Sequence, residues 1–277
     1  MFAELSADLA KITPNYPVQV GCPLCLRTFT EDAIDLEEPE LTEEHIIPEE
    51  LGGKIVTLTC KTCNNVHGAK IDAHLIQMMR SRDTMEGFGK RPFRGSIKVS
   101  GMTVPTDVDW KAFAGETTTF RLRKFKPGVH DAIRAEMRKG TVETINVHFS
   151  FDYIPARANI ALLRAGYLAM FQRLGYSYIL NPTLAVMREI INTYENYREE
   201  LGQFVGEVGS DGASFKEPLH FIPIQGGIAV MVVMTLKTDA KRHYAAFLPS
   251  PELQPGGVLA TLGEAAKSIA PRPAITA

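Results

Sequence analysis

The chain has 277 residues, of which 45% are hydrophobic and 22% charged, and its formal net charge is −2. This balance is typical of globular proteins and excludes collagen, long disorder and coiled coil. The longest apolar run, residues 226–236, is too short to cross a bilayer, which takes about 20 apolar residues. No basic region followed by an apolar stretch and a cleavage site opens the chain. We therefore expect a cytoplasmic protein with no membrane partner.

Hydrophobic periodicity and the positions of Pro and Gly predict both helices and strands. A short amphipathic helix opens the chain, and apolar residues at helical spacing predict a helix over 61–79. The elements predicted beyond residue 92 are strands at 96–100, 118–123, 144–149, 220–224, 228–236 and 243–248, and helices at 127–140, 155–174 and 182–201. The fold class is therefore α+β. The predicted segments are a module at 1–80, a mixed α+β domain at 81–250 and a loose tail, rich in Pro, Gly and Ala, at 251–277.

Charge is distributed unevenly along the chain. Residues 1–53 hold 2 Lys or Arg against 12 Asp or Glu, residues 54–145 hold 17 against 9, and residues 146–277 hold 11 of each. Basic residues of the middle block lie close to Phe88 and Phe93 in the sequence. They are Lys90, Arg91, Arg94, Arg121, Arg123, Lys124 and Lys126. Such a stretch can follow a phosphate backbone or can be the solvated face of a strand.

The four cysteines fall into two Cys-x-x-Cys pairs, Cys22 with Cys25 and Cys60 with Cys63. A secreted disulfide framework would normally occur in a smaller chain with a higher share of cysteine. Two such pairs are instead the spacing of a tetrahedral thiolate site, in which each turn directs two sulfurs at one ion about 2.3 Å away. The sequence therefore predicts a structural zinc site. The same thiols would also suit an iron site or a redox dithiol.

Further polar residues lie between and after the cysteine pairs. An acidic-His-Ile-Ile-Pro run occupies 44–48, a Gly-Gly turn follows at 52–53, and Cys-x-x-Cys-Asn-x-x-His occupies 60–67. This pattern resembles the HNH endonucleases whose two-strand-and-helix motif is stapled by a four-cysteine zinc site. It is also similar in layout to phage junction-resolving endonucleases. The resemblance covers about residues 20–80 and implies an N-terminal zinc-stabilised ββα-metal (His-Me finger) module, followed by a mixed α/β domain.

The resemblance implies metal-dependent hydrolysis of phosphodiester bonds in DNA, either duplex or branched. It makes His45 the general base that activates water, Glu44 and Asn64 the ligands of a catalytic Mg²⁺ or Mn²⁺, and His67 a third ligand or a phosphate contact. Simpler interpretations exist for each residue taken alone. Glu44 could belong to an acidic surface cluster, His45 could be a surface strand residue, and Asn64 could cap a helix.

Strand geometry restricts how the acidic-His pair can act. Neighbouring side chains on a strand point to opposite faces. Glu44 and His45 can therefore both point towards one site only if the strand bends or bulges. Pro48 and the Gly-Gly turn make such an irregularity plausible. No Asn occurs at 55–59 on the second strand, so we expect a backbone carbonyl or Thr57 to orient the imidazole.

Helix geometry separates the remaining polar residues. Asn64 and His67 are three residues apart and should share one side of a helix. Asp72 follows His67 by five residues, so an α-helix would point its side chain in another direction than that of His67. We expect Asp72 to be an ordinary helix residue or a polar contact behind the site.

Two other function classes stay open. One is a non-catalytic zinc-knuckle module that binds nucleic acid and is attached to a sensor or interaction domain. The other is a thiol redox protein, which would need a thioredoxin-like setting. For an endonuclease that cuts both strands of a duplex, a symmetric homodimer would be the simplest arrangement.

Overall fold

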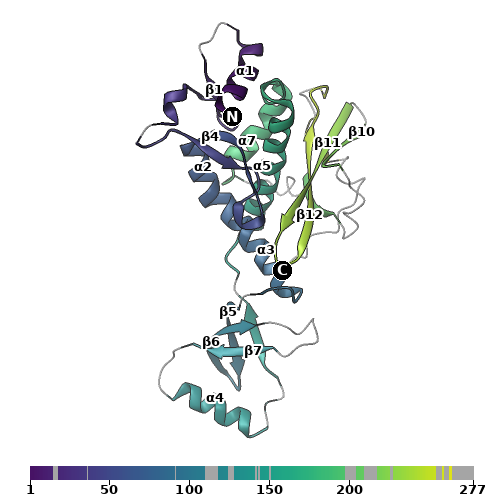
Figure 1. Ribbon diagram of the computed structural model, residues 1–277. Coiled ribbons are helices and arrows are strands. Elements are labelled where there is room, and N and C mark those ends of the chain that lie inside the picture. Colours follow the sequence, from purple (N-terminus) through teal and green to yellow (C-terminus); the bar gives the residue numbers. More distant parts are fainter. Residues whose placement is uncertain are drawn as a thin grey trace. The chain divides into compact units, whose positions relative to one another are not determined.

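A computed structural model describes residues 1–14, 18–35, 37–90, 92–109, 118–123, 128–140, 142, 144–149, 151–196, 204–208, 217–224, 227–253, 258 and 262–263. The chain forms two compact units. Unit 1 combines residues 1–76 with 153–277, and unit 2 is the continuous segment 77–152. Unit 2 is therefore inserted into unit 1 along the sequence (Figure 1).

Unit 1 begins with short hairpins and helices and ends with a larger sheet. Its first elements are α1 (Phe2–Ile12), β1 (Val20–Gly21), β2 (Thr28–Phe29), η1 (Glu31–Ala33), β3 (Leu41–His45), η2 (Glu49–Leu51), β4 (Ile55–Cys60), α2 (Lys61–His67) and the π-helical turn η3 (Gly68–Asp72). After unit 2 come α5 (Pro155–Leu174), α6 (Tyr176–Ile179), η5 (Pro182–Leu184), α7 (Ala185–Asn192), β9 (Val205–Val208), β10 (Leu219–Ile224), β11 (Gly227–Lys237) and β12 (Lys241–Pro249).

Helix α5 forms the centre of unit 1 and packs against β11 and β12 (Figure 1). These strands belong to an antiparallel sheet in the order β10-β11-β12-β9. Gly166 on α5 lets the helix approach the sheet closely, because a Cβ at this position would lie 2.6 Å from the Cβ of Ala246. The helix is apolar on most sides because it is covered both by the sheet and by the N-terminal segment.

Three polar side chains attach the first cysteine pair to the later helices. The Tyr176 hydroxyl accepts from the Gly21 N–H at 2.9 Å and donates to the Gly21 carbonyl at 2.7 Å. Tyr167 donates to the carbonyl of Pro23, and Asn192 donates to the carbonyl of Leu24. The backbone around Cys22 and Cys25 is thus held by residues that lie more than 140 positions further along the chain.

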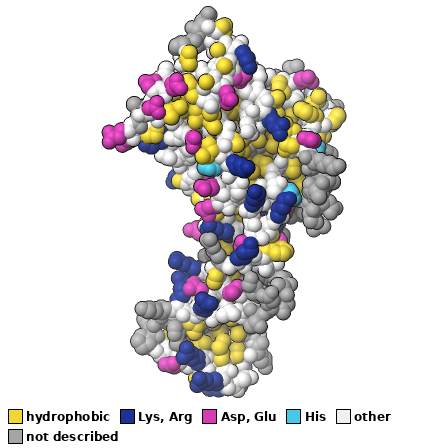
Figure 2. Space-filling model, in the orientation of Figure 1, with side chains coloured by type: hydrophobic (Ala, Val, Ile, Leu, Met, Phe, Trp, Pro, Cys, Tyr) yellow, Lys and Arg dark blue, Asp and Glu magenta, His cyan; other side chains and the backbone are white. Residues whose placement is uncertain are grey.

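The described residues of unit 2 form a four-stranded antiparallel sheet, the later part of helix α3 (Ala73–Met85) and helix α4 (Val129–Arg138). The strands are β5 (Phe93–Val99), β6 (Met102–Asp109), β7 (Thr119–Leu122) and β8 (Asn146–Phe149), in the order β7-β6-β5-β8. Helix α4 covers one face through Ile133, which packs with Ile97, Val99 and Val104. In Figure 2, Lys and Arg side chains lie over the unit that contains these strands.

Most predicted elements are confirmed. Helix 155–174 has the predicted ends, and the predicted strands correspond to β5, β7, β8, β10, β11 and β12 within a few residues. The helix predicted over 182–201 is wrong in length, because a 3₁₀ turn starts it and α7 ends at Asn192. The mixed helix and strand composition agrees with the predicted α+β class.

The division into units differs from the predicted one. Residues 81–250 were expected to form one domain, whereas 153–277 join the N-terminal segment because α5 packs against it. Much of the tail predicted to be loose lies outside the described residues, but Leu253, Val258 and Leu262 are described and are buried. Within the described residues, no helix is long and apolar enough to cross a membrane.

Candidate metal centre and polar site

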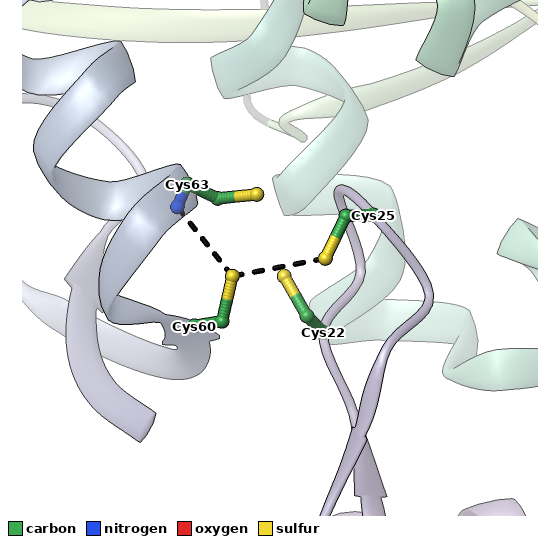
Figure 3. Close-up of side chains that lie close together, drawn as sticks. All are labelled: Cys22, Cys25, Cys60 and Cys63. Atoms are coloured by element: carbon green, nitrogen blue, oxygen red, sulfur yellow. Dashed lines mark hydrogen bonds between the residues drawn. The ribbon is translucent and has the colours of Figure 1, made fainter. Parts of the chain in front are cut away.

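The four cysteines come together at one point between the β1–β2 hairpin and the start of α2 (Figure 3). Their sulfurs all lie within 4.8 Å of one another, and the Cys25 and Cys60 sulfurs are 3.7 Å apart. A zinc ion with four sulfurs at 2.3 Å would separate them by about 3.8 Å, the edge of the tetrahedron. All four thiols are free. The cysteines are therefore arranged as in a tetrahedral zinc site.

Neighbouring groups stabilise negative charge on the sulfurs of Cys25 and Cys60, whereas hydrogen bonding among the thiols raises the pKa of Cys22 and Cys63. Hydrogen bonding with the Cys22 thiol lowers the pKa of Cys25 to about 6, and the same neighbour lowers the pKa of Cys60. The Cys60 sulfur also accepts from the Arg27 guanidinium at 3.3 Å and from the Cys63 N–H at 3.4 Å. Because the second bond caps α2, Cys60 fixes the start of this helix as well as a corner of the centre.

Strands β3 and β4 form the hairpin that carries the acidic-His pair. Glu44 pairs with Thr57, but His45 pairs with Ile55, so a β-bulge lies between Glu44 and His45. The bulge breaks the regular alternation of side chains, as the sequence led us to expect. In the turn that follows, a Cβ at Gly53 would lie 1.6 Å from the carbonyl oxygen of Ile47, so only glycine fits there.

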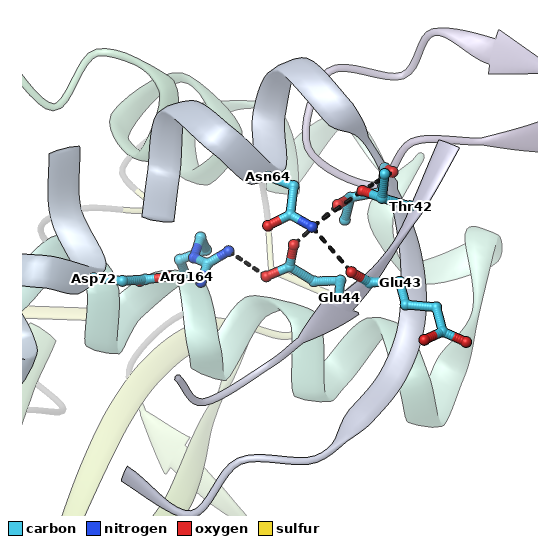
Figure 4. A network of polar contacts seen from close by, with 7 residues as sticks. Thr42, Glu43, Glu44, Asn64, Asp72 and Arg164 are labelled. Atoms are coloured by element: carbon cyan, nitrogen blue, oxygen red, sulfur yellow. Dashed lines mark hydrogen bonds and ion pairs between the residues drawn. The ribbon is translucent and has the colours of Figure 1, made fainter. Parts of the chain in front are cut away.

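Asn64 is bound to the strand that carries the pair. Its amide nitrogen donates to the Thr42 hydroxyl at 3.0 Å and to the Glu43 carbonyl at 2.9 Å (Figure 4). The helix cap is supplied by Cys60, so Asn64 does not have the capping role that its position also allowed. These two bonds place Asn64 directly beside the segment that leads into Glu44 and His45.

Glu44 takes part in a buried ion network. One carboxylate oxygen accepts from Arg164 Nη1 at 2.6 Å, and the other accepts from the Thr59 hydroxyl at 2.9 Å. The second Arg164 nitrogen, Nη2, donates to Asp72 at 2.6 Å. Arg164 is 0% exposed and Glu44 is 2% exposed. The guanidinium therefore bridges two carboxylates inside unit 1, as Figure 4 shows for its contact with Glu44.

The π turn η3 explains the position of Asp72. A π turn closes over five residues, so residues five apart lie on nearly the same side of the helix, unlike in an α-helix. Asp72 reaches Arg164 and so forms a polar contact behind Glu44, one of the two roles expected for it from the sequence. Burial raises the pKa of Asp72 to about 6, although the charge of Arg164 acts in the opposite direction.

His67 lies in the interior beside the same guanidinium. It is 2% exposed, and its ring contacts Tyr194 edge to face with the centroids 6.5 Å apart. Burial and the positive charge of Arg164 lower the pKa of His67 to about 4, so the imidazole is neutral at pH 7. Its Nδ1 atom has no hydrogen-bond partner among the described groups.

These two residues should affect stability in opposite directions as pH changes. Asp72 holds its proton more tightly in the folded chain, so its ionisation reduces stability as pH rises from about 4 to 6. His67 is protonated more easily in the unfolded chain, so stability is lost as pH falls from 6.5 towards about 4. Their effects therefore largely cancel between pH 4 and 6.

We expect Asp72→Asn to uncouple the two effects. The difference in the free energy of unfolding between this variant and the wild type should be about 2 kcal/mol larger, in favour of the variant, at pH 7 than at pH 4.5. The reason is that the variant does not bear the cost of ionising the buried Asp72 side chain. Urea unfolding at the two pH values, followed by tyrosine fluorescence, measures the difference. Asp35→Asn, at an exposed position, is the matched control and should show no such dependence. Equal shifts in both variants would contradict the prediction.

The structure separates two of the predicted site residues, Asn64 and His67. Asn64 is bound to β3 beside Glu44 and the bulge, whereas His67 faces the buried network. The His45 imidazole is half-buried and has no hydrogen-bond partner in the described part of the chain. Thr57 pairs with Glu44 rather than with His45, and its buried hydroxyl has no partner among the described groups.

Sequence analysis missed Arg164. A signal for it exists, because Arg164 is the only charged residue between Asn159 and Gln172 on an otherwise apolar helix. A single charge in a helix that is buried on most sides needs a counter-charge. Asp72, given only a general role behind the site, is one of its two partners.

Part of the chain matches a known family. The family model described as HNH endonuclease matches residues 22–80, which include both cysteine pairs, the β3–β4 hairpin and α2. No curated protein and no solved structure matches the chain. The match coincides with the segment that holds the thiolate centre, the bulge and Asn64. Residues 22–80 are therefore similar to the HNH endonuclease family, and this segment is called the HNH region.

Proposed function

We propose that the chain is a metal-dependent DNA endonuclease of the HNH type, with a ββα-metal module formed by β3, β4 and α2. The observation that carries the proposal is the attachment of Asn64 to Thr42 and Glu43, next to a bulge between Glu44 and His45. The family match over 22–80 supports the same reaction class.

Glu44 and Asn64 would hold the catalytic cation. The Asn64 nitrogen is the atom bound to β3, so the amide oxygen is left for a ligand. Each Glu44 oxygen accepts one hydrogen bond and keeps a second lone pair. Carboxylate and amide oxygens suit Mg²⁺ or Mn²⁺. A cation bound there supplies Lewis-acid stabilisation of the phosphate and of the leaving oxygen.

His45 would act as the general base. Imidazole titrates near neutral pH and can take a proton from water as it attacks phosphorus. Since no described side chain hydrogen-bonds the half-buried ring, its nitrogens are left for water and for the orienting carbonyl that the sequence led us to expect.

The buried residues Arg164 and His67 would support the site from the interior of unit 1. Arg164 holds the Glu44 carboxylate in one orientation through the 2.6 Å contact. His67 was predicted to be a third ligand or a phosphate contact, and because it is buried and neutral we propose a ligand or packing role for it rather than contact with an exposed phosphate.

A supercoiled-plasmid assay tests the proposal. Wild-type protein should nick or linearise the plasmid with Mg²⁺ or Mn²⁺ and not with EDTA. His45→Ala should reduce the rate at least about a hundredfold, since a general base contributes about 10²–10⁴-fold. His243→Ala, on β12, is the matched control and should cleave normally. Cleavage that survives in His45→Ala at the wild-type rate would assign the base elsewhere.

The second candidate is a non-catalytic zinc-knuckle module that binds nucleic acid. The engagement of Glu44 by Arg164 favours it, because both carboxylate oxygens already have partners. A protein with bound zinc that binds DNA and leaves plasmid intact with every divalent cation tested would establish this alternative and exclude the nuclease.

A further inference from the structure

Charge is separated between the two units. Residues 77–152 hold 14 Lys or Arg against 9 Asp or Glu, whereas the rest of the chain holds 16 against 23. Unit 2 is therefore net positive and unit 1 net negative, although the whole chain is close to neutral. A positive unit inserted into a negative one is the distribution expected when one part of a chain contacts a polyanion.

One face of the unit 2 sheet carries four Lys or Arg residues against two Asp residues. The buried Ile97, Val99 and Val104 point towards α4, so the alternate residues of the strands point to the other face. The face away from α4, here called the open face, is formed by Arg94, Ser96, Lys98, Thr103, Pro105, Asp107, Asp109, Thr119, Arg121, Arg123, Asn146 and His148. No described element of unit 2 covers it.

The strand register arranges the cations in rows. Asp107 on β6 is directly opposite Arg94 on β5 and Arg121 on β7, and its carboxylate lies 3.6 Å from Arg123. Three Arg residues thus flank Asp107 on this face, and of these Arg123 forms an ion pair with it. Arg94, Lys98 and Arg121 are exposed, and none of the three makes an ion pair with a described residue. They are therefore available to an external anion.

The open face is also hollowed. A shallow depression of about 670 Å³ is lined by Arg94, Ser96, Thr103, Arg123 and His148, among others. A second depression of about 600 Å³ adjoins it and shares Pro105 and Arg123. Guanidinium donors line both depressions, and hydroxyl donors also line the first, whereas the carboxylate of Asp107 lines the second. Guanidinium and hydroxyl groups bind phosphate oxygens in protein–DNA contacts.

The composition of this face favours a duplex over a single strand. Single-stranded nucleic acids are bound on aromatic side chains on which the bases stack. None of the open-face positions is Phe, Tyr or Trp. Phe149 also lines the larger depression, but its ring packs against Phe93 and Phe151. Cations two strands apart, such as Arg94 and Arg121, are separated by about 10 Å, so they can contact phosphates on both sides of a groove, whose width in B-DNA is about 6–12 Å.

The geometry points to the open face as the surface that binds the phosphate backbone of duplex DNA. This inference rests on the proposed function for its choice of substrate, but it assigns DNA binding to unit 2, outside the HNH region. The electrostatic contacts bring the duplex to the protein without reading its sequence, because phosphates carry no base information.

Fluorescence anisotropy with a labelled 25-base-pair duplex tests this assignment. The full chain carries His45→Ala in all samples, so that cleavage does not disturb the titration. Arg94→Glu with Arg121→Glu should raise the Kd at least tenfold. The slope of log K against the logarithm of the salt concentration should also become less steep by about 2, since each lost phosphate contact reduces the magnitude of this slope by about 1.

The matched control is Arg134→Glu with Arg138→Glu, which makes the same charge change at exposed positions on α4. The control should change the Kd less than threefold. Equal weakening by both double variants, or no effect of the open-face variant, would overturn the assignment, as would tighter binding of single-stranded DNA or RNA. The outcomes remain separable from those of the plasmid assay, because a chain that binds duplex through this face yet cuts nothing refutes the nuclease alone.

Discussion

Replacing Cys60 by serine is expected to remove zinc and to abolish cooperative unfolding of the N-terminal part of unit 1. Structural zinc contributes about 10–16 kcal/mol in small modules, which is as large as the whole stability of a typical domain, about 5–15 kcal/mol. Cys60 is 0% exposed, and it also caps α2. Its loss should therefore free the end of β4 and the helix that holds Asn64.

The chain provides separate optical probes for this experiment. All eight tyrosines lie outside residues 77–152, and the one tryptophan, Trp110, lies within them. Tyr167 and Tyr176 hydrogen-bond the backbone around the first cysteine pair, so the tyrosine transition should become smaller and less cooperative in Cys60→Ser. The tryptophan transition should persist because unit 2 has its own core.

Zinc content measured by mass spectrometry should be one ion per wild-type chain and none in the variant. Thr62→Ala, which alters an exposed residue between the two thiols, is the control and should keep both zinc and the tyrosine transition. A wild-type chain without metal, together with an unchanged transition in Cys60→Ser, would show that the thiols are not a metal centre.

Arg164→Met is expected to destabilise unit 1 by about 3–5 kcal/mol, because it leaves the carboxylates of Glu44 and Asp72 buried without their counter-charge. Methionine preserves most of the side-chain volume, so the loss is mainly electrostatic. Urea denaturation followed by tyrosine emission measures it as a lower midpoint. Arg173→Met, an exposed position on the same helix, should stay within about 0.5 kcal/mol of the wild type.

The triple variant Arg164→Met, Glu44→Gln, Asp72→Asn separates loss of pairing from loss of packing. Since replacing a whole buried ion network is often close to neutral, the triple variant should recover most of the stability lost in Arg164→Met. A triple variant as unstable as the single one would contradict the ion-network interpretation and would assign the effect to packing around α5.

The HNH region was predictable from sequence because its marks are local. The two Cys-x-x-Cys pairs and the residues between them have fixed spacings, and each spacing corresponds to a turn, a hairpin or the start of a helix. The bulge at Glu44 and His45 was expected for the same reason, since the regular alternation of a strand would separate the two side chains.

The buried network was not predictable in this way. Glu44 and Arg164 are 120 positions apart, and no local spacing relates them. The partner of Asp72 was also not predictable, because a π turn is rare and changes which residues share a helix side. The division into units failed similarly, since the packing of α5 on the N-terminal segment depends on the tertiary fold rather than on hydrophobic periodicity.

The insertion of unit 2 determines the order in which the chain can fold during its synthesis. Residues 77–152 are continuous and can fold as soon as they leave the ribosome, whereas Glu44 must wait for Arg164, 120 residues later. At about 5–20 residues per second, this delay is roughly 6–24 s. The basic sheet is therefore complete before the buried guanidinium reaches the strand that carries His45, and a truncated chain ending before α5 would contain the cysteines without the residue that neutralises the carboxylates behind them.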